Sequence, residues 1–493
     1  MPKHILYIKK YNARDCLLAI RGEQIPQALG LDVTRLCVVR GICYHPGFAK
    51  ELHGSLPEFI RALNARSIMS NEIPDMKEPD EIPYCIWHPQ TATEATYREL
   101  AHRYPQMKYQ IGRACAVAGY LNLYGELGLL PEVHIAEEAR DNGQSAILDA
   151  IMAAGTKYAA MNDYTRTVEM DQPTMAHLNG DTAVRSYLDI RQRYTKPSLS
   201  LNSFSLGYKT HYFDITEDWR IDEYESDEPI LREDVTPLLY TPLPADLPNV
   251  NKDLLILMAA YYGNIDRYAR LRRPMRVPTE FHCIVRGVYH NTMFAKWWSL
   301  QPTIDDYRIQ CAINARFIMN NDLSRISPDT RDSVLPYCIW YPAVADWRTY
   351  MELARRKPSM KQSVARACIV ADYKTVYDGL NAEPDSSLMA EARDSPNPHY
   401  LRDLERKAAE RGGVVSDNSP EWKRNTRKQM FEPTTTWLNK DVSNFFAETE
   451  FSWAYDGVVA NMSFVELNVC APDELKQKDF VDLGELYEPW HGF

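Results

Sequence analysis

The chain has 493 residues, of which 45% are hydrophobic and 25% charged, close to the composition of an ordinary globular protein. An aromatic content of 11% excludes disorder over the whole chain, and a net charge of −11 opposes binding to the phosphates of nucleic acid. No apolar run approaches the roughly 20 residues of a membrane-spanning helix, and Lys9 and Lys10 interrupt the N-terminus too early for a signal peptide. We therefore expect an intracellular protein, cytoplasmic or nuclear, that binds neither membrane nor nucleic acid.

Short motifs from the first half of the chain recur in the same order in the second half, which indicates an internal duplication. The matched pairs are Val39-Arg40-Gly41 with Val285-Arg286-Gly287, Asn64-Ala65-Arg66 with Asn314-Ala315-Arg316, Pro83-Tyr84-Cys85-Ile86-Trp87 with Pro336-Tyr337-Cys338-Ile339-Trp340, Arg113-Ala114-Cys115 with Arg366-Ala367-Cys368, and Glu138-Ala139-Arg140 with Glu391-Ala392-Arg393. The spacing between partners grows slowly along the chain. Small insertions between matched elements explain this drift, whereas chance matches would not stay in order.

The boundary between the two copies lies in a stretch that is first acidic and then rich in proline. Proline lacks the backbone N–H and fixes φ, so residues 236–252 cannot form a regular helix. The sequence therefore predicts a first helical repeat unit over residues 1–216, a linker over 217–252, a second unit over 253–441 and a C-terminal tail or cap over 442–493.

Apolar residues within each copy follow helical spacing. In Asp253–Leu271 they recur at i, i+3, i+4 and i+7 until Gly263-Asn264 interrupts the pattern, which predicts a helix, a Gly-Asn turn and a second helix. The run Ile256–Asn264 resembles the helix–turn–helix core of ankyrin repeats. His282–Trp298, with Gly287 near its middle, and Gln362–Leu380, with Asp372 at the glycine position, resemble further hairpins of this kind. The chain also resembles filamentous-fungal proteins of this type.

This resemblance implies a mainly α fold: two tandem copies of an ankyrin-like hairpin unit that form an α-solenoid or α-array. The ankyrin Thr-Pro-Leu-His signature is absent, and the hairpins are irregularly spaced. Two segments are expected to differ. Lys196–Tyr212 alternates polar and apolar residues, which favours a long loop or a strand pair, and the C-terminal tail has β-like stretches.

Arginines recur in apolar helical contexts in both copies, at Arg40/Arg286, Arg66/Arg316 and Arg113/Arg366. A buried guanidinium needs a partner, and the sequence offers Glu99/Glu352 or Glu138/Glu391. These arginines form either a structural ion-pair lattice or, where they are accessible, an anion-binding site.

A function located in one copy should break the symmetry between the copies. Glu51-Leu52 is replaced by Trp297-Trp298, Tyr44 by His290, and His88 by Tyr341. Two adjacent tryptophans cannot both face one side of a helix, so we expect one in the core and the other at a surface or pocket. They serve either packing or aromatic recognition.

No metal or cofactor motif is present. The ten cysteines form no CxxC, and templates such as GxGxxG, the P-loop, GxSxG and HExxH are absent. Asn320–Ser324 follows a predicted helix and is typical of a cap or turn. It resembles the Asn-Asp-x-x-Ser metal motif of class I terpene cyclases, but its serine comes one position early and no DDxxD partner exists. We therefore expect no metal and no cofactor.

Two functions remain open. The first is a binding or scaffold module for a protein partner, since stacked hairpins present broad surfaces. The second is an enzyme that cyclises or rearranges a small molecule in an aromatic cavity lined by arginines at the seam of the two copies. The candidate catalytic residues are Asp322, His290 and Glu352. The candidate binding residues are Trp297, Trp298, Trp340, Tyr341, Arg286, Arg316 and Arg366.

Overall fold

The computed structural model describes residues 12–179, 192–195, 210–213, 238, 241–248, 250, 252–274, 276, 280–304 and 306–414. Its contacts divide the chain into two compact units. Of the described residues, unit 1 contains those up to 213 and 243–250, and unit 2 contains 238, 241–242 and 252–414. Most of the acidic linker and the whole predicted C-terminal tail lie outside the described residues.

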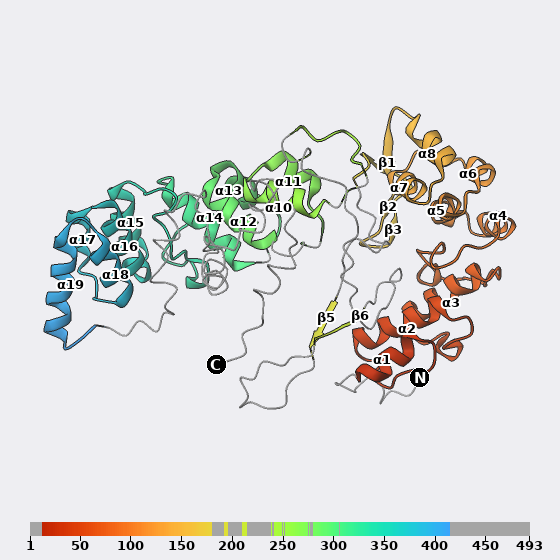
Figure 1. Ribbon diagram of the computed structural model, residues 1–493, viewed down its shortest axis with the longest axis horizontal. Helices are drawn as coiled ribbons and strands as arrows, with labels where there is room; N and C mark the ends of the chain where they lie inside the picture. The colour runs from red at the N-terminus through yellow and green to blue at the C-terminus, as the bar shows by residue number, and fades with distance from the viewer. Residues whose placement is uncertain are drawn as a thin grey trace, which may run out of the picture. The chain divides into compact units, whose positions relative to one another are not determined.

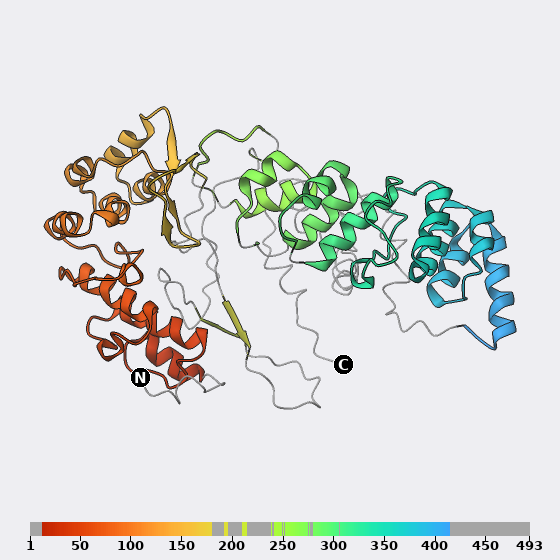
Figure 2. The same cartoon turned by 180° about the vertical axis from the view of Figure 1, so that it is seen from behind.

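Both units are mainly helical, as the apolar spacing predicts (Figures 1 and 2). The helices of unit 1 are α1 (Ala13–Ile20), α2 (Asp32–Tyr44), α3 (Pro57–Met69), α4 (Glu94–Arg103), α5 (Lys108–Ala118), α6 (Leu121–Leu127), α7 (Val133–Asp141) and α8 (Ser145–Met152). Those of unit 2 are α10 (Asp253–Tyr261), α11 (Ile265–Leu271), α12 (Glu280–His290), α13 (Thr292–Ser299), α14 (Tyr307–Met319), α15 (Trp347–Arg356), α16 (Lys361–Ala371), α17 (Lys374–Leu380), α18 (Ser386–Asp394) and α19 (Pro398–Arg411). Short 3-10 helices are η2 (Lys50–Leu52), η3 (Pro79–Glu81), η4 (Pro105–Met107), η5 (Asp332–Val334) and η6 (Pro358–Met360).

Three short antiparallel strand pairs accompany the helices of unit 1. β1 (Lys157–Ala159) pairs with β4 (Thr174–Ala176), and β2 (Met161–Asn162) pairs with β3 (Thr167–Val168). β5 (Gln192–Thr195) pairs with β6 (Thr210–Phe213). β5 directly precedes the segment Lys196–Tyr212, for which the sequence predicts a long loop or a strand pair, and β6 overlaps the end of that segment. Residues 196–209 between them lie outside the described part of the chain.

Equivalent helix ends in the two units adopt equivalent conformations. Asn71 (φ 67°) and Asn321 (φ 64°) follow α3 and α14, and the side chain of each accepts a hydrogen bond of 2.7 Å from the backbone N–H of Thr93 or Asp346. Gly119 and Asp372 end α5 and α16 in the left-handed region (φ 79° and 54°). Asp372 therefore occupies the glycine position of its hairpin, as the sequence predicts, and Asn320–Ser324 forms the predicted turn.

The first hairpin of unit 2 is confirmed in detail. Gly263 (φ 65°) ends the turn after α10, and the side chain of Asn264 caps α11 by accepting from Arg267 N at 3.2 Å. In the next hairpin the break falls at Asn291, between α12 and α13, and not near Gly287. Gly287 lies within α12. A Cβ at this position would lie 1.9 Å from the carbonyl oxygen of Ala260, so the absence of a side chain permits α12 to approach α10 closely.

Apolar side chains fill the interior of each unit. Unit 1 contains one cluster around α1–α3 and another around α4–α8 and the short strands. The proline-rich segment contributes to unit 1: Leu247 is buried, its N–H donates to Leu178 O at 2.8 Å, and its carbonyl accepts from Arg140 Nη1 at 2.9 Å. All described cysteines are buried free thiols.

Close helix contact at Gly287 gives the first testable prediction. We expect Gly287→Ala to lower the free energy of unfolding by about 1–3 kcal/mol, because the new methyl group must displace a backbone carbonyl. Gly41→Ala should behave in the same way, since its Cβ would meet Ala19 O at 2.0 Å. The control is Gly379→Ala in α17, where nothing lies within 4 Å and alanine should stabilise the helix by about 0.5–1 kcal/mol. Urea denaturation measures all three; equal effects at positions 287 and 379 would contradict the packing argument.

Candidate functional site

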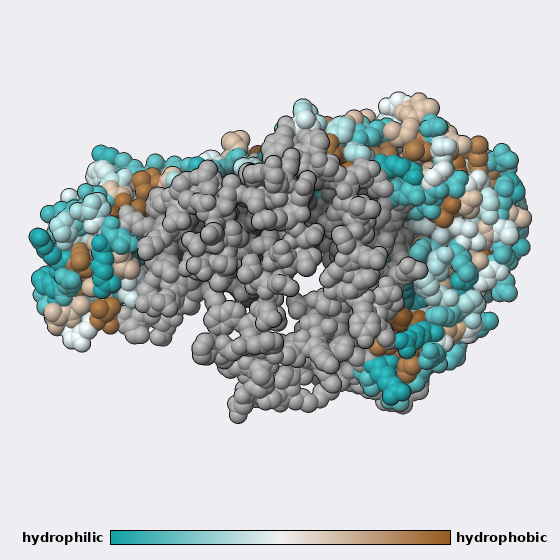
Figure 3. All heavy atoms as spheres, viewed as in Figure 1, coloured by the Kyte–Doolittle hydropathy of each residue, from teal (hydrophilic) through white to brown (hydrophobic). Residues whose placement is uncertain are grey.

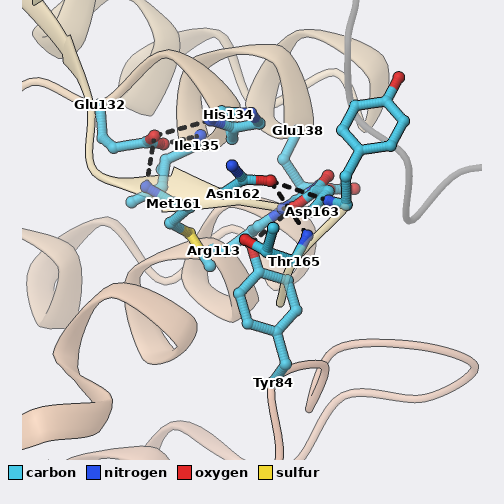
Figure 4. A network of polar contacts seen from close by, with 11 residues as sticks. Tyr84, Arg113, Glu132, His134, Ile135, Glu138, Met161, Asn162, Asp163 and Thr165 are labelled. Atoms are coloured by element: carbon cyan, nitrogen blue, oxygen red, sulfur yellow. Dashed lines mark hydrogen bonds and ion pairs between the residues drawn. The ribbon is translucent and has the colours of Figure 1, made fainter. Parts of the chain in front are cut away.

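A buried arginine lies at the centre of a polar network in unit 1 (Figure 4). The side chain of Arg113, on α5, is fully buried. Its Nε donates to Glu138 Oε2 on α7 at 2.8 Å, and its Nη1 and Nη2 donate to the two carboxylate oxygens of Asp163 at 2.6 and 3.0 Å. A two-pronged bond of this kind is the strongest that a guanidinium forms with a carboxylate. Glu138 is one of the partners that the sequence offered; Glu99 instead pairs with Arg103 on the surface.

The loop that precedes α4 completes this network, which we call the Arg113 network: Arg113, Glu138, Asp163, Tyr84 and Trp87. Tyr84 donates its hydroxyl to Asp163 Oδ1 at 2.6 Å, and the guanidinium of Arg113 lies 4.6 Å from the centre of the Trp87 ring. Burial alone would raise the pKa of Asp163, but the charges of Arg113 and His134 lower it well below its ordinary value. The carboxylate is therefore ionised and fully engaged, which favours a structural cross-link over a catalytic group.

A histidine–carboxylate pair lies beside the Arg113 network (Figure 4). The carboxylate of Glu132 is buried, caps α7 by accepting from Ile135 N at 2.8 Å, and contacts His134 Nδ1 at 2.7 Å. Burial alone would lower the pKa of His134, but the negative charge of Glu132 and the hydrogen bond to it raise the pKa to about 9. His134 is therefore a cation at neutral pH.

Unit 2 repeats the core of this arrangement with different partners. Arg366, the equivalent of Arg113, is also buried; its Nε donates to Glu391 Oε2 at 3.0 Å and its Nη1 to the Tyr337 hydroxyl at 2.8 Å. Its guanidinium lies 5.0 Å from the centre of the Trp340 ring. The position of His134 is occupied by Ser387. Arg366 and Trp340, both candidate binding residues from the sequence, thus belong to a buried interhelical contact.

Four other candidates gather in a second place, which we call the His290 cluster: Arg286, His290, Arg316 and Tyr341. Arg286 and His290 lie one turn apart on α12, and the His290 ring meets the Tyr341 ring edge to face with centroids 5.4 Å apart. Burial and the positive charges of Arg286 and Arg316 lower the pKa of His290 to about 3, so the imidazole is neutral.

The equivalent place in unit 1 contains the same pair of rings in reversed order. There the Tyr44 hydroxyl and His88 Nε2 are hydrogen-bonded at 2.8 Å, with ring centroids 5.9 Å apart. The two replacements that the sequence shows separately, Tyr44 by His290 and His88 by Tyr341, are therefore one reciprocal exchange within a contacting pair.

Trp297 and Trp298 lie on α13 and differ in burial. Trp298 is in the core, 4% exposed, whereas Trp297 is partly exposed and stacks on Phe294 with ring centroids 5.8 Å apart. The guanidinium of Arg272 covers Trp297 at 4.8 Å. The pair therefore divides between core and surface as expected, and Trp297 has ordinary packing partners.

Asp322 and Glu352 lie in separate surroundings from His290. Asp322 belongs to the turn after α14, where its Oδ1 accepts from Ser324 N at 2.8 Å. Hydrogen bonding by the side chain of Ser324, and then by its backbone, lowers the pKa of Asp322. Glu352 is paired on α15 with Arg355 and Arg356 at 2.6 and 2.7 Å. No contact in the described part of the chain joins these three candidate catalytic residues.

An exposed apolar strip runs along the start of α15, and we call it the α15 face: Val344, Trp347 and Met351. These side chains are 43%, 39% and 52% exposed. In unit 1 the positions of Trp347 and Met351 hold Glu94 and Arg98, which form an ion pair of 2.6 Å, and Arg98 also contacts Glu126 at 2.8 Å. Figure 3 shows apolar residues as small patches within a largely hydrophilic surface. The α15 face is thus a local replacement of charge by apolar area.

Sequence reasoning did not find Asp163, Tyr84, Glu132 or His134. Tyr84 and Tyr337 stand in the longest unbroken repeat motif, and this recurrence could have indicated that both tyrosines belong to a shared contact.

Within the described residues, no group of three or more His, Cys, Asp or Glu side chains could hold a metal ion. The same part of the chain contains no helix long and apolar enough to cross a membrane.

Comparison with known proteins finds two matches to one family. The YKP1 C-terminal domain family matches residues 87–191 and 340–434, and the matches begin at Trp87 and Trp340, which are equivalent in the duplicated motif. The chain is also similar to the uncharacterized killer plasmid pGKl-2 protein 1 of Kluyveromyces lactis, with 24% identity over 161 residues that cover 32% of this chain and 68% of the relative. No solved structure matches the chain.

The Arg113 network predicts a large loss of stability when its carboxylate is removed. We expect Asp163→Ala to lower the free energy of unfolding by about 3–5 kcal/mol, because it leaves a buried guanidinium only partly neutralised. The control is Glu99→Ala, which breaks the exposed pair with Arg103 and should change stability by less than about 1 kcal/mol. Similar effects of the two substitutions in urea denaturation would contradict the assigned role.

His134 predicts a pH dependence confined to unit 1. The pKa of His134 is about 9 in the folded chain and about 6.5 in the unfolded chain. The protonated His134 therefore contributes to the free energy of unfolding in full below pH 6.5, and this contribution is lost as pH rises through 9. The loss amounts to about 3 kcal/mol, or roughly a hundredfold in the hydrogen-exchange protection of α7 between pH 6 and pH 9.

The duplication supplies the control for that experiment. Helix α18 carries Ser387 where α7 carries His134, so its protection should not fall with pH for this reason. His134→Gln should abolish the extra loss in α7. Equal losses in α7 and α18, after correction for intrinsic exchange rates, would show that the His134–Glu132 pair does not cause the pH dependence.

Proposed function

We propose that this chain is a helical-repeat binding module and that its second unit recognises a protein partner through the α15 face. The observation that carries this proposal is the replacement of the Glu94–Arg98 ion pair of unit 1 by exposed Trp347 and Met351 in unit 2. Exposed tryptophan and methionine cost solubility, and tryptophan is enriched among the residues that dominate binding energy. Selection for fold alone gives no reason to replace charge by apolar area at an exposed helix start.

Other exposed apolar side chains of unit 2 support the same function. Tyr262 (52% exposed) and Met293 (65%) lie at adjacent hairpin turns, which are joined by a hydrogen bond of 3.2 Å from Asn291 Nδ2 to Gly263 O. The equivalent of Met293 in unit 1 is Gly47. Unit 2 thus presents an exposed methionine at a turn where unit 1 has glycine.

The enzyme alternative receives less support from the same residues. Its candidates Asp322 and Glu352 are engaged by Ser324 and by two arginines, and neither contacts His290 in the described part of the chain. The arginines Arg113 and Arg366 are buried in interhelical contacts and cannot reach a substrate without unfolding their surroundings. A binding module, of ankyrin-like type as the hairpin resemblance implies, needs no such convergence of titratable groups.

The test compares partner capture by matched variants. We expect Trp347→Glu with Met351→Glu to weaken binding of a purified partner by roughly 30-fold or more, the loss typical of a dominant interface residue. Partners are identified by quantitative affinity capture with the full chain and then measured by isothermal titration calorimetry. The control is Glu94→Ala with Arg98→Ala at the equivalent positions of unit 1. A partner that binds both variants as tightly as the unaltered chain would overturn the assignment of the α15 face.

A further inference from the structure

We propose that unit 2 contains a binding site for a phosphate group, formed by Arg286, His290, Arg316 and Tyr341 between α12, α14 and the loop that follows Trp340. This inference concerns a ligand that the proposed function does not require, and none of its residues belongs to the α15 face. It rests on the charge of Arg316, on a difference between the units, and on the exposure of the two arginines.

Among the described residues, the guanidinium of Arg316 donates hydrogen bonds only to neutral groups. Its Nη1 donates to Tyr289 O at 3.1 Å, and its Nε and Nη2 donate to the hydroxyl of Thr292 at 3.0 and 2.9 Å. No carboxylate in the described residues forms an ion pair with it, and burial lowers its pKa. A partly buried cation without a counter-charge is costly, and a bound anion would remove that cost.

His290 adds a neutral donor beside this charge. The positive charges of both Arg286 and Arg316 act on its imidazole, and no carboxylate within the described part of the chain offsets them there. Arg286 lies one turn from His290 on α12, where its Nη1 donates to Tyr261 O at 3.1 Å and its guanidinium covers the Tyr261 ring at 3.9 Å. Arg316 Nη1 donates to the carbonyl of Tyr289, the residue before His290. The two arginines therefore bring two positive charges to the neighbourhood of one neutral ring. Phosphate carries close to two negative charges at neutral pH and accepts several hydrogen bonds, which matches this set better than a single carboxylate does.

The equivalent place in unit 1 is closed by its own side chains. Arg66, the equivalent of Arg316, also donates to a helix-end carbonyl, Cys43 O at 3.0 Å, so that bond is common to both units and structural. Its Nη2, however, donates to Gln90 Oε1 at 2.7 Å. Unit 2 has Ala343 where unit 1 has Gln90. The Nη2 atom of Arg316 donates instead to the hydroxyl of Thr292, which stands where unit 1 has Pro46, so a long acceptor side chain is replaced by a short one.

Exposure changes in the same direction. Arg40 and Arg66 are 3% and 5% exposed, whereas Arg286 and Arg316 are partly exposed. The Tyr44 hydroxyl of unit 1 is bonded to His88, which ties the two rings together. Unit 2 thus presents accessible arginines at a place where unit 1 buries them, as expected if one copy kept the packing and the other acquired a ligand.

The experiment titrates the full chain into inorganic phosphate and follows the 31P NMR signal, with sodium acetate as the competing carboxylate at matched ionic strength. We expect saturable phosphate binding. Ala343→Gln, which introduces the acceptor of unit 1, should weaken it tenfold or more, and Arg316→Met should do the same. Gln90→Ala is the matched control in unit 1 and should leave the phosphate affinity unchanged. Thermal unfolding of each variant checks that unit 2 remains folded.

The outcomes separate clearly. Binding that is weakened by Ala343→Gln and by Arg316→Met but not by Gln90→Ala supports the site. No binding by the unaltered chain, or binding that neither unit 2 substitution weakens, overturns it. Acetate that displaces phosphate at equal concentration overturns the phosphate assignment and identifies a carboxylate site. Because these substitutions leave Trp347 and Met351 intact, failure here and failure of the α15 face are distinguishable.

Discussion

Burying a guanidinium costs free energy in each unit, and much of the architecture around Arg113 and Arg366 follows from meeting that cost. Arg113 cannot lose its proton, so helix α7, the β2–β3 turn and the loop before α4 must bring Glu138, Asp163 and Tyr84 to it. These groups come from three separate parts of the chain. Removing either carboxylate would leave the buried guanidinium only partly neutralised, so the network favours one arrangement of these segments, whatever its net contribution to stability.

The second unit meets the same requirement with fewer charges among the described residues. Arg366 receives Glu391 and the Tyr337 hydroxyl, and Trp340 covers its guanidinium as Trp87 covers Arg113. What the two units share is the arginine, its glutamate, the tyrosine and the tryptophan. One difference nearby is that unit 1 has the titratable His134 where unit 2 has Ser387. The four shared residues serve the packing of each unit, and His134 is the residue at which we expect the stability of unit 1 to depend on pH.

Helix positions and local turns were predictable from the sequence because the signals for them are local. Apolar spacing located the helices, Gly263-Asn264 located a turn, and the recurrence of Arg113 with Glu138 offered that glutamate as one of two possible partners, of which the structure shows Glu138. Asp163 was out of reach, since a carboxylate 50 positions away becomes a partner only through the path of the chain between them. Gly287 was assigned to a turn because glycine satisfies two needs, left-handed backbone and close approach, and sequence does not separate them. The Tyr–His exchange was readable in principle: two complementary replacements at equivalent positions indicate a contact.

Symmetry between the units also decides how each unusual residue is interpreted. Arg113 and Arg366, which both copies keep and bury, serve the common packing. A residue that changes together with its contact partner, as Tyr44 and His88 do, preserves the packing in another form. Two changes are not reversals of this kind: Gln90 to Ala343 leaves the short hydroxyl of Thr292 as the acceptor from the arginine, and Glu94 to Trp347 replaces a charged side chain by a partly exposed aromatic ring. Both changes fall in unit 2, and packing within the unit gives no reason for either. Under the functions proposed above, an anion would supply the counter-charge of the arginine and a protein partner would cover the ring.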